Sequence, residues 1–213
     1  MNAWGALPNI LDNLIADDRI RPVLAVFVDA REPGNPQVNR RETEFLLYPV
    51  EHARFIAEEL VPAIDLAYHT NPQPDARTIV GVSYEGVSSI FIASTQSNVF
   101  HNLTAFSPSL WVLDSPQYLS DPRYVEGSQL MYPLIQAVTK CGGDTGTTCP
   151  SFPLKIFLTA GVPSWDIGDL YPLVITLKDQ QYPVEYHPVL EGHAWSHWRG
   201  LSDEMLIYFF GND

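Results

Sequence analysis

A serine, an aspartate and a histidine follow one another along the chain in an order that suits nucleophilic catalysis. Ser83 lies in the run Gly81-Val82-Ser83-Tyr84-Glu85-Gly86, between a strand-like and a helix-like segment. A nucleophile elbow has this context, because a tight strand-to-helix turn exposes the serine hydroxyl beside a helix N-terminus that stabilises negative charge. The backbone N–H of Tyr84 would then be one oxyanion donor. The usual pattern has glycine in place of Glu85, so the alternative is an ordinary helix N-cap at Ser83.

A serine nucleophile needs a general base, and in this type of site the histidine comes last along the chain. We expect His193 to be the base, because it lies between the last predicted strand and the last predicted helix. His187 falls inside a predicted strand, and His101 lies at a loop edge. His193 and His197 could share a helical face and bind zinc, but the sequence lacks both the glutamate of HExxH and a third ligand. We therefore expect no metal site.

The acid that orients the histidine is expected in the loop after the strand predicted over 154–160. Asp166 is the first carboxylate beyond that strand, and Asp169 is its rival. Either residue could instead be a carboxylate that stabilises a helix N-terminus. We favour Asp166.

Aromatic residues flank the predicted site loops in the sequence. Trp111, Trp165 and Trp195, together with Tyr84 and Trp198, could line a pocket for an aromatic acyl group. The alternative is that they pack in the core, as most tryptophans do.

Short apolar runs alternate with helical patterns along the chain. We expect strands at 22–29, 77–81, 103–106, 154–160 and 183–187, and helices at 7–15, 50–68 (kinked at Pro62), 85–95, 167–180 and 196–210. This alternation predicts an α/β fold with a mostly parallel sheet flanked by helices. Residues 111–152, rich in Pro, Gly, Ser and Tyr, break the alternation, and we expect them to form a lid or pocket wall.

Length and charge limit the remaining possibilities. The 213 residues suit a single domain, 1–213, and 12 basic against 25 acidic residues give a net charge of −13. This charge disfavours nucleic acid and anionic membranes as partners. Cys141 and Cys149 are too few for a disulfide framework, so they form either one short loop disulfide or none. The sequence shows no signal-peptide pattern, which leaves cytoplasm and periplasm both open, and it does not indicate an oligomeric state.

The sequence resembles the putative esterase family, which includes enterochelin esterases, esterase D and feruloyl esterase domains. The matching stretches follow the family order from about residue 7 to residue 201: VLAVFVDA, RRETEFL, EELVPAID, RTIVGVSYEG, FSPSLW and EGHAWSHWRGL. The resemblance implies an α/β-hydrolase fold, with Ser83 as nucleophile, His193 as base and the acid within 165–169. It also implies a small-molecule ester substrate and no metal or organic cofactor.

The sequence departs from the family pattern at two places. Glu85 and Glu191 replace the first glycine of the pairs that follow the serine and precede the histidine. Family domains also carry strands before the segment that begins here, and the loop after one of them supplies the second oxyanion donor. The fold is thus expected to lack N-terminal strands, and the second donor has no candidate.

We predict a serine carboxylic ester hydrolase that works through an acyl-enzyme. The alternative is a non-catalytic binding or scaffold domain, favoured by Glu85 and the short N-terminus. Acyl transfer to an acceptor other than water would use the same residues.

Overall fold

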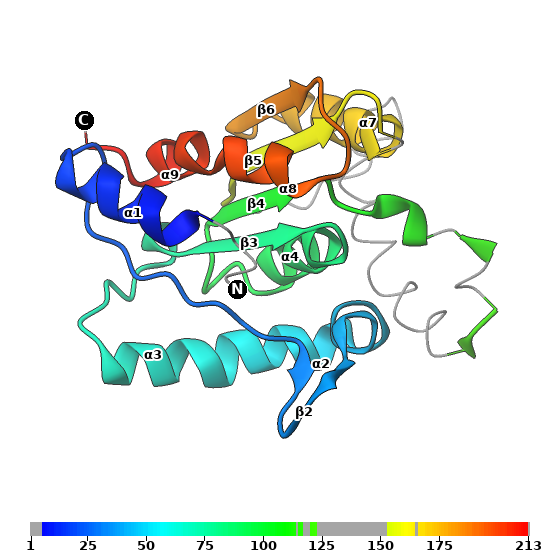
Figure 1. Ribbon diagram of the computed structural model, residues 1–213, viewed down its shortest axis with the longest axis horizontal. Helices are drawn as coiled ribbons and strands as arrows, with labels where there is room; N and C mark the ends of the chain where they lie inside the picture. Colours follow the sequence, from blue (N-terminus) through cyan, green and yellow to red (C-terminus); the bar gives the residue numbers. More distant parts are fainter. Residues whose placement is uncertain (1–5, 114, 117–119, 123–152, 165, 213) are drawn as a thin grey trace.

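The structure is a computed structural model, and it describes residues 6–113, 115–116, 120–122, 153–164 and 166–212 (Figure 1). The side chains of Asp166 and Asp169 are not among those described. Within these ranges, no helix is long and apolar enough to cross a membrane.

A four-stranded parallel sheet forms the centre of the fold. Its order is β3 (Thr78–Val82), β4 (Asn102–Phe106), β5 (Lys155–Gly161) and β6 (Val184–Val189). All neighbouring pairs are parallel. Four of the five predicted strands are confirmed, as is the parallel arrangement. The carboxyl ends of these strands meet at one edge of the sheet, on the right in Figure 1.

Helices cover both faces of the sheet. The side chains of α4 (Tyr84–Thr95) and α7 (Asp166–Asp179) pack in one apolar cluster, and those of α1 (Leu7–Ala16), α8 (Trp195–Gly200) and α9 (Ser202–Phe210) pack in another. The predicted helix over 196–210 is therefore divided at Leu201. The expected fold class, a mostly parallel sheet flanked by helices, is confirmed.

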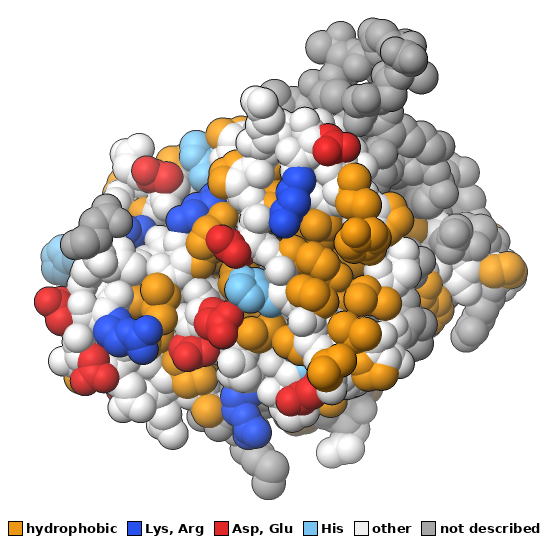
Figure 2. Space-filling view, turned by 90° about the horizontal axis from the view of Figure 1, so that it is seen from above, with side chains coloured by type: hydrophobic (Ala, Val, Ile, Leu, Met, Phe, Trp, Pro, Cys, Tyr) orange, Lys and Arg blue, Asp and Glu red, His pale blue; other side chains and the backbone are white. Residues whose placement is uncertain are grey.

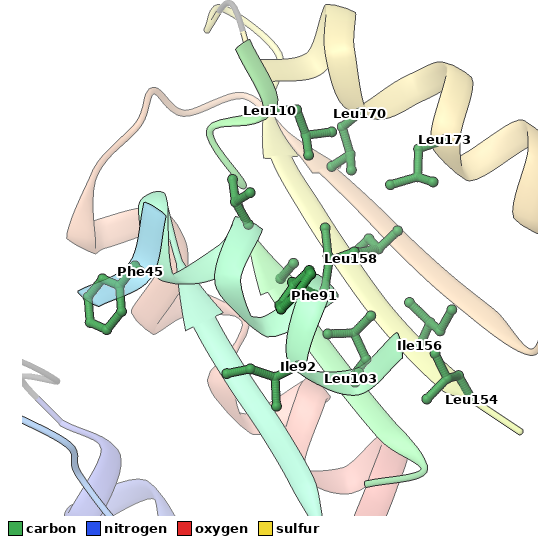
Figure 3. Packing of buried hydrophobic residues seen from close by; sticks show 14 of the residues in the cluster. Phe45, Phe91, Ile92, Leu103, Leu110, Leu154, Ile156, Leu158, Leu170 and Leu173 are labelled. Carbon is green, nitrogen blue, oxygen red and sulfur yellow. The ribbon is translucent and has the colours of Figure 1, made fainter. Parts of the chain in front are cut away.

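The two clusters follow from the alternation of side chains along the strands. In β5, Ile156 and Leu158 face the first cluster, whereas Phe157 faces the second. Figure 3 shows Ile156 and Leu158 beside Leu170 and Leu173 of α7 and Phe91 of α4. β4 and β5 are buried on both faces; β5 therefore appears in the sequence as a mostly apolar run, whereas β4 also buries the polar residues Asn102 and Thr104.

The long helix predicted over 50–68 is helical throughout but changes its hydrogen-bonding pattern. It consists of α2 (Pro49–Arg54), a π-helical segment (Phe55–Leu60) and α3 (Val61–Ala67). Pro62 lies in the first turn of α3. Because proline has no N–H to donate to the preceding turn, a break in the α-helical pattern at this point is expected.

The prediction of a buried strand over 22–29 is wrong. The segment has no regular secondary structure, and Leu24 and Phe27 are 50% and 48% exposed. The reason lies at its ends. Arg21 N donates to Phe210 O, 3.0 Å away, and Arg40 N donates to Ala30 O, 2.8 Å away. These bonds connect the segment to α9 and to a hairpin rather than to β3. A groove of about 490 Å³ is lined by the segment on one side and by β3 on another.

A short β-hairpin follows the segment. It consists of β1 (Arg31–Glu32) and β2 (Asn35–Asn39), paired antiparallel. Gly34 forms the turn with a positive φ of 83°, a conformation that glycine adopts without steric cost.

Two predictions that concern residues 111–152 lie outside the described residues. Most of the lid or pocket wall expected at 111–152 is one, and the pairing of Cys141 with Cys149 is the other.

Candidate active site

Ser83 occupies a strained backbone position between β3 and α4. Its φ of 61° and ψ of −118° fall in a region that residues with a side chain rarely adopt. Ser83 N donates to Phe106 O at 3.0 Å, and Ser83 O accepts from Ser109 N at 3.1 Å, so neighbouring backbone holds the turn. The Ser83 side chain makes no capping hydrogen bond to α4, and its backbone is not extended as in an N-cap. The N-cap alternative therefore does not describe this residue.

Two glycines let the backbone pass closely around Ser83. A Cβ atom on Gly81 would lie 2.0 Å from the carbonyl oxygen of Glu85, and one on Gly86 would lie 2.9 Å from Pro108 Cα. Any other residue would therefore force the turn apart at either position. The chain keeps glycine where the backbone approaches are closest.

Ser109, whose hydroxyl contacts that of Ser83, was not predicted to belong to the site. Ser109 lies just beyond β4, is buried, and has its Oγ 3.2 Å from the Oγ of Ser83. It belongs to the stretch FSPSLW, which carried part of the family resemblance but was not assigned to the site. A residue that follows the neighbouring parallel strand reaches the same edge of the sheet, and this signal could have identified it.

His193 lies at the same edge, in the bend between β6 and α8. Its ring meets that of Trp198 edge-on, with centroids 5.0 Å apart. Trp198 Nε1 donates to the Oγ of Ser107 at 3.1 Å, and Ser107 leads to Ser109 beside the Ser83 hydroxyl. His193 is thus linked through Trp198 to Ser107, which precedes the partner of the Ser83 hydroxyl by two residues.

The other histidines have different surroundings. His197 is buried in α8 and bonded to the hydroxyl of Thr159; because α8 begins only at Trp195, His193 and His197 do not share a helix. His187 stacks on Phe157, with centroids 4.7 Å apart, and lies between two carboxylates. His101 lines a hollow at the amino ends of the strands, opposite Ser83. In the described part of the chain, no three potential ligands are grouped to hold a metal ion.

For the two candidate acids, Asp166 and Asp169, the structure describes the backbone but not the side chain. Asp166 is the first residue of α7, and Asp169 lies in the first turn of the same helix. Because neither side chain is described, Asp166 stays a prediction, with the carboxylate at a helix N-terminus as its alternative.

The Glu85 carboxylate pairs with Arg41. Its two carboxylate oxygens accept hydrogen bonds from Arg41 Nε at 2.8 Å and Arg41 Nη2 at 2.7 Å. The Arg41 guanidinium also lies 5.6 Å from the centroid of the Tyr84 ring. Sequence reasoning missed Arg41, although it belongs to RRETEFL, another stretch of the family resemblance.

The aromatic residues predicted to bind substrate differ in exposure. Trp195 is 45% exposed and meets Trp198 edge-on at 5.1 Å, whereas Trp111 packs against the core. Trp165 lies outside the described residues. Seen from above, hydrophobic side chains form a broad patch on the side toward which the strands point (Figures 1 and 2). Large exposed hydrophobic residues of loops at this end of the sheet include Val162 and Leu190.

The family described as "Putative esterase" matches residues 4–139, which is more than half of the chain. The chain belongs to this family. The expectation from the sequence is thereby confirmed at the level of the family.

Solved structures of esterases share the fold. The enterobactin esterase of Shigella flexneri, solved with 2,3-dihydroxy-N-benzoyl-glycine, has a TM-score of 0.70 and 20% identity over 92% of this chain. The match covers 46% of that enzyme, so the chain spans about half its length. A ferulic acid esterase has a TM-score of 0.68 and 14% identity over 98% of this chain and 78% of its own. Fluorophosphonate-binding serine hydrolase F of Staphylococcus aureus has a TM-score of 0.57 and 15% identity, with 76% and 64% covered.

Proposed function

We propose that the protein is a serine carboxylic ester hydrolase that works through an acyl-enzyme. The observation that carries the proposal is Ser83, held at a positive φ where β3 meets α4, beside the contacts that lead to His193. Hydrolases of this class keep their nucleophile in such a turn. Membership in the esterase family supports the same chemistry.

The proposed reaction has two stages. Ser83 Oγ attacks the ester carbonyl carbon while His193 accepts the hydroxyl proton, and Asp166 orients the imidazole. The N–H of Tyr84, the first residue of α4, donates to the oxyanion of the tetrahedral intermediate. The alcohol leaves with the proton from His193, and the acyl group stays on Ser83. Water then attacks the acyl carbon and gives one proton to His193, which passes it to Ser83 Oγ as the acid is released and the free serine is restored.

The substrate proposed is an ester with an aromatic acyl group. Exposed Trp195, Val162 and Leu190, which follow the carboxyl ends of the strands, support an apolar acyl group at this end of the sheet. Among proteins with the same fold, one was solved with 2,3-dihydroxy-N-benzoyl-glycine and another is named a ferulic acid esterase, and both compounds carry an aromatic ring. Trp165 and Trp111 remain proposed pocket residues.

A covalent probe and a substrate panel test this function. A fluorophosphonate should form one adduct, on Ser83, and mass spectrometry of a proteolytic digest should locate it. Aromatic p-nitrophenyl esters should be hydrolysed faster than acetyl esters, and Ser83→Ala should abolish both labelling and hydrolysis. A protein that takes no label and hydrolyses no ester would instead be a non-catalytic binding domain.

A further inference from the structure

The ion pair of Arg41 and Glu85 joins the chain beyond the β1–β2 hairpin to the first turn of α4. The two side chains are 40% and 31% exposed, so the pair is only partly solvated. Parallel N–H···O bonds from one guanidinium to one carboxylate are geometrically specific and stronger than neutral hydrogen bonds. Hydrogen bonding to Glu85 raises the pKa of Arg41, which therefore stays charged while it is paired.

The position of Glu85 makes this pair relevant to the reaction centre. Glu85 follows Ser83 by two residues and lies in the first turn of the helix whose N-terminus faces the proposed oxyanion. A carboxylate without a partner there would add negative charge close to the place where the reaction develops negative charge. In a partly desolvated site, such repulsion is weakened by solvent only in part.

Arg41 also contacts the residue between Ser83 and Glu85. Its guanidinium lies over the ring of Tyr84, within the range of a cation–π interaction. One arginine therefore holds both residues that follow the nucleophile, including the one whose N–H is the proposed oxyanion donor.

We infer that Arg41 is a positioning residue that allows a glutamate to replace glycine in the nucleophile turn. This inference rests on the proposed hydrolase function. Arg41 neutralises the Glu85 carboxylate and restrains Tyr84, so that the turn keeps both its shape and its favourable electrostatic potential. Arg41 acts through Glu85 and Tyr84 rather than on the substrate.

A double-mutant cycle tests the inference. We would measure kcat and KM for a p-nitrophenyl ester, and the rate of fluorophosphonate labelling, in Arg41→Ala, Glu85→Gly and the double variant. Arg41→Ala should lower kcat and the labelling rate about 10-fold with little change in KM, since the loss falls on the transition state. With glycine at position 85 the same substitution should cost less than about 3-fold, because no carboxylate remains to be neutralised. Arg41→Lys, which keeps the charge, should recover most of the loss.

Arg40 offers a matched control. It is 42% exposed and forms a 3.3 Å ion pair with Glu44 in the same segment. Arg40→Ala should leave kcat within about 2-fold of wild type, as expected for an exposed pair away from the reaction. If Arg41→Ala does not fold, Arg41→Gln with Glu85→Gln gives a cycle of similar side-chain volume and the same expected result.

The outcomes separate this inference from the function on which it rests. The inference is overturned if Arg41→Ala lowers kcat by the same factor in the wild-type background and in the Glu85→Gly background. Arg41 would then act independently of the carboxylate. Labelling of Arg41→Ala at the wild-type rate overturns it as well, while leaving the hydrolase function intact. Wild-type protein that takes no label at Ser83 overturns the hydrolase function and the positioning role together.

Discussion

The hydroxyl oxygens of Ser83 and Ser109 lie 3.2 Å apart, although 26 residues separate them in the sequence. Parallel pairing brings them together, because Val82 and Phe106 are opposite each other at the ends of β3 and β4. Ser109 also donates its backbone N–H to Ser83 O, so it holds both the main chain and the side chain of the proposed nucleophile.

Ser109→Ala should lower kcat about 5-fold, the equivalent of one hydrogen bond of about 1 kcal/mol, because the Ser83 hydroxyl loses a partner that limits its rotamers. The backbone bond remains in this variant, so the turn should keep its shape. Steady-state kinetics with a p-nitrophenyl ester would measure the change. Ser94→Ala is a suitable control, since that buried hydroxyl donates to Ile90 O within α4. An unchanged kcat in Ser109→Ala would show that the hydroxyl contact does not position the nucleophile.

Ser83→Ala and His193→Ala should each lower kcat about 10³-fold or more, because each removes a group that takes part in bond making or proton transfer. Asp166→Ala should cost more than Asp169→Ala, since only the former is proposed to orient His193. The four variants would be compared at saturating substrate. Equal losses at the two aspartates would contradict the choice of acid, and an active Ser83→Ala would contradict the mechanism.

Trp198→Phe should destabilise the fold by about 1–2 kcal/mol and also reduce activity. The substitution leaves the buried hydroxyl of Ser107 without its indole donor, in a residue that already has a positive φ of 45°. It also alters the ring against which His193 rests. Chemical denaturation and steady-state kinetics would report the two effects. Trp195→Phe is the matched control, because that exposed indole should be replaced at little cost to stability.

The free energy of unfolding should fall as the pH drops from about 6.5 to about 4, in part through His52. Burial between Phe45 and Phe55 lowers the pKa of His52 from 6.5 to about 4. In this interval the unfolded chain binds a proton that the folded chain does not, so acid favours unfolding, by at most about 3 kcal/mol from this residue. His52→Leu should weaken the pH dependence, whereas exposed His69→Leu should leave it unchanged. Urea titrations across this interval would measure both, and an identical acid slope in His52→Leu would rule out this source.

Sequence patterns predicted those strands and helices whose buried positions recur as apolar residues along the chain. β3 and β5 appear in the sequence as short, mostly apolar runs because helices cover both faces of the sheet. The apolar run over 22–29 has the same composition, yet composition does not specify a hydrogen-bonding partner. Its ends are bound to Phe210 and to the hairpin, and these contacts are too distant in sequence for a local pattern to reveal.

The candidate site shows the same division. The spacing around Ser83 and the place of His193 after the last strand were visible in the sequence. Arg41 was not, because it reaches the turn only through a tertiary contact between separate elements, and Ser109 was missed although its place after the neighbouring strand indicates the same edge of the sheet. The pairing of Glu85 likewise depends on a residue 44 positions earlier in the chain.

The positive φ of Ser83 sets catalysis and thermostability against each other at one residue. Glycine adopts this conformation more readily than serine, so Ser83→Gly would relieve strain in the folded state even as it removes the proposed nucleophile. Directed evolution that selects only for heat resistance would therefore tend to discard this serine. Its retention in a population of variants would be a measure of selection for chemistry.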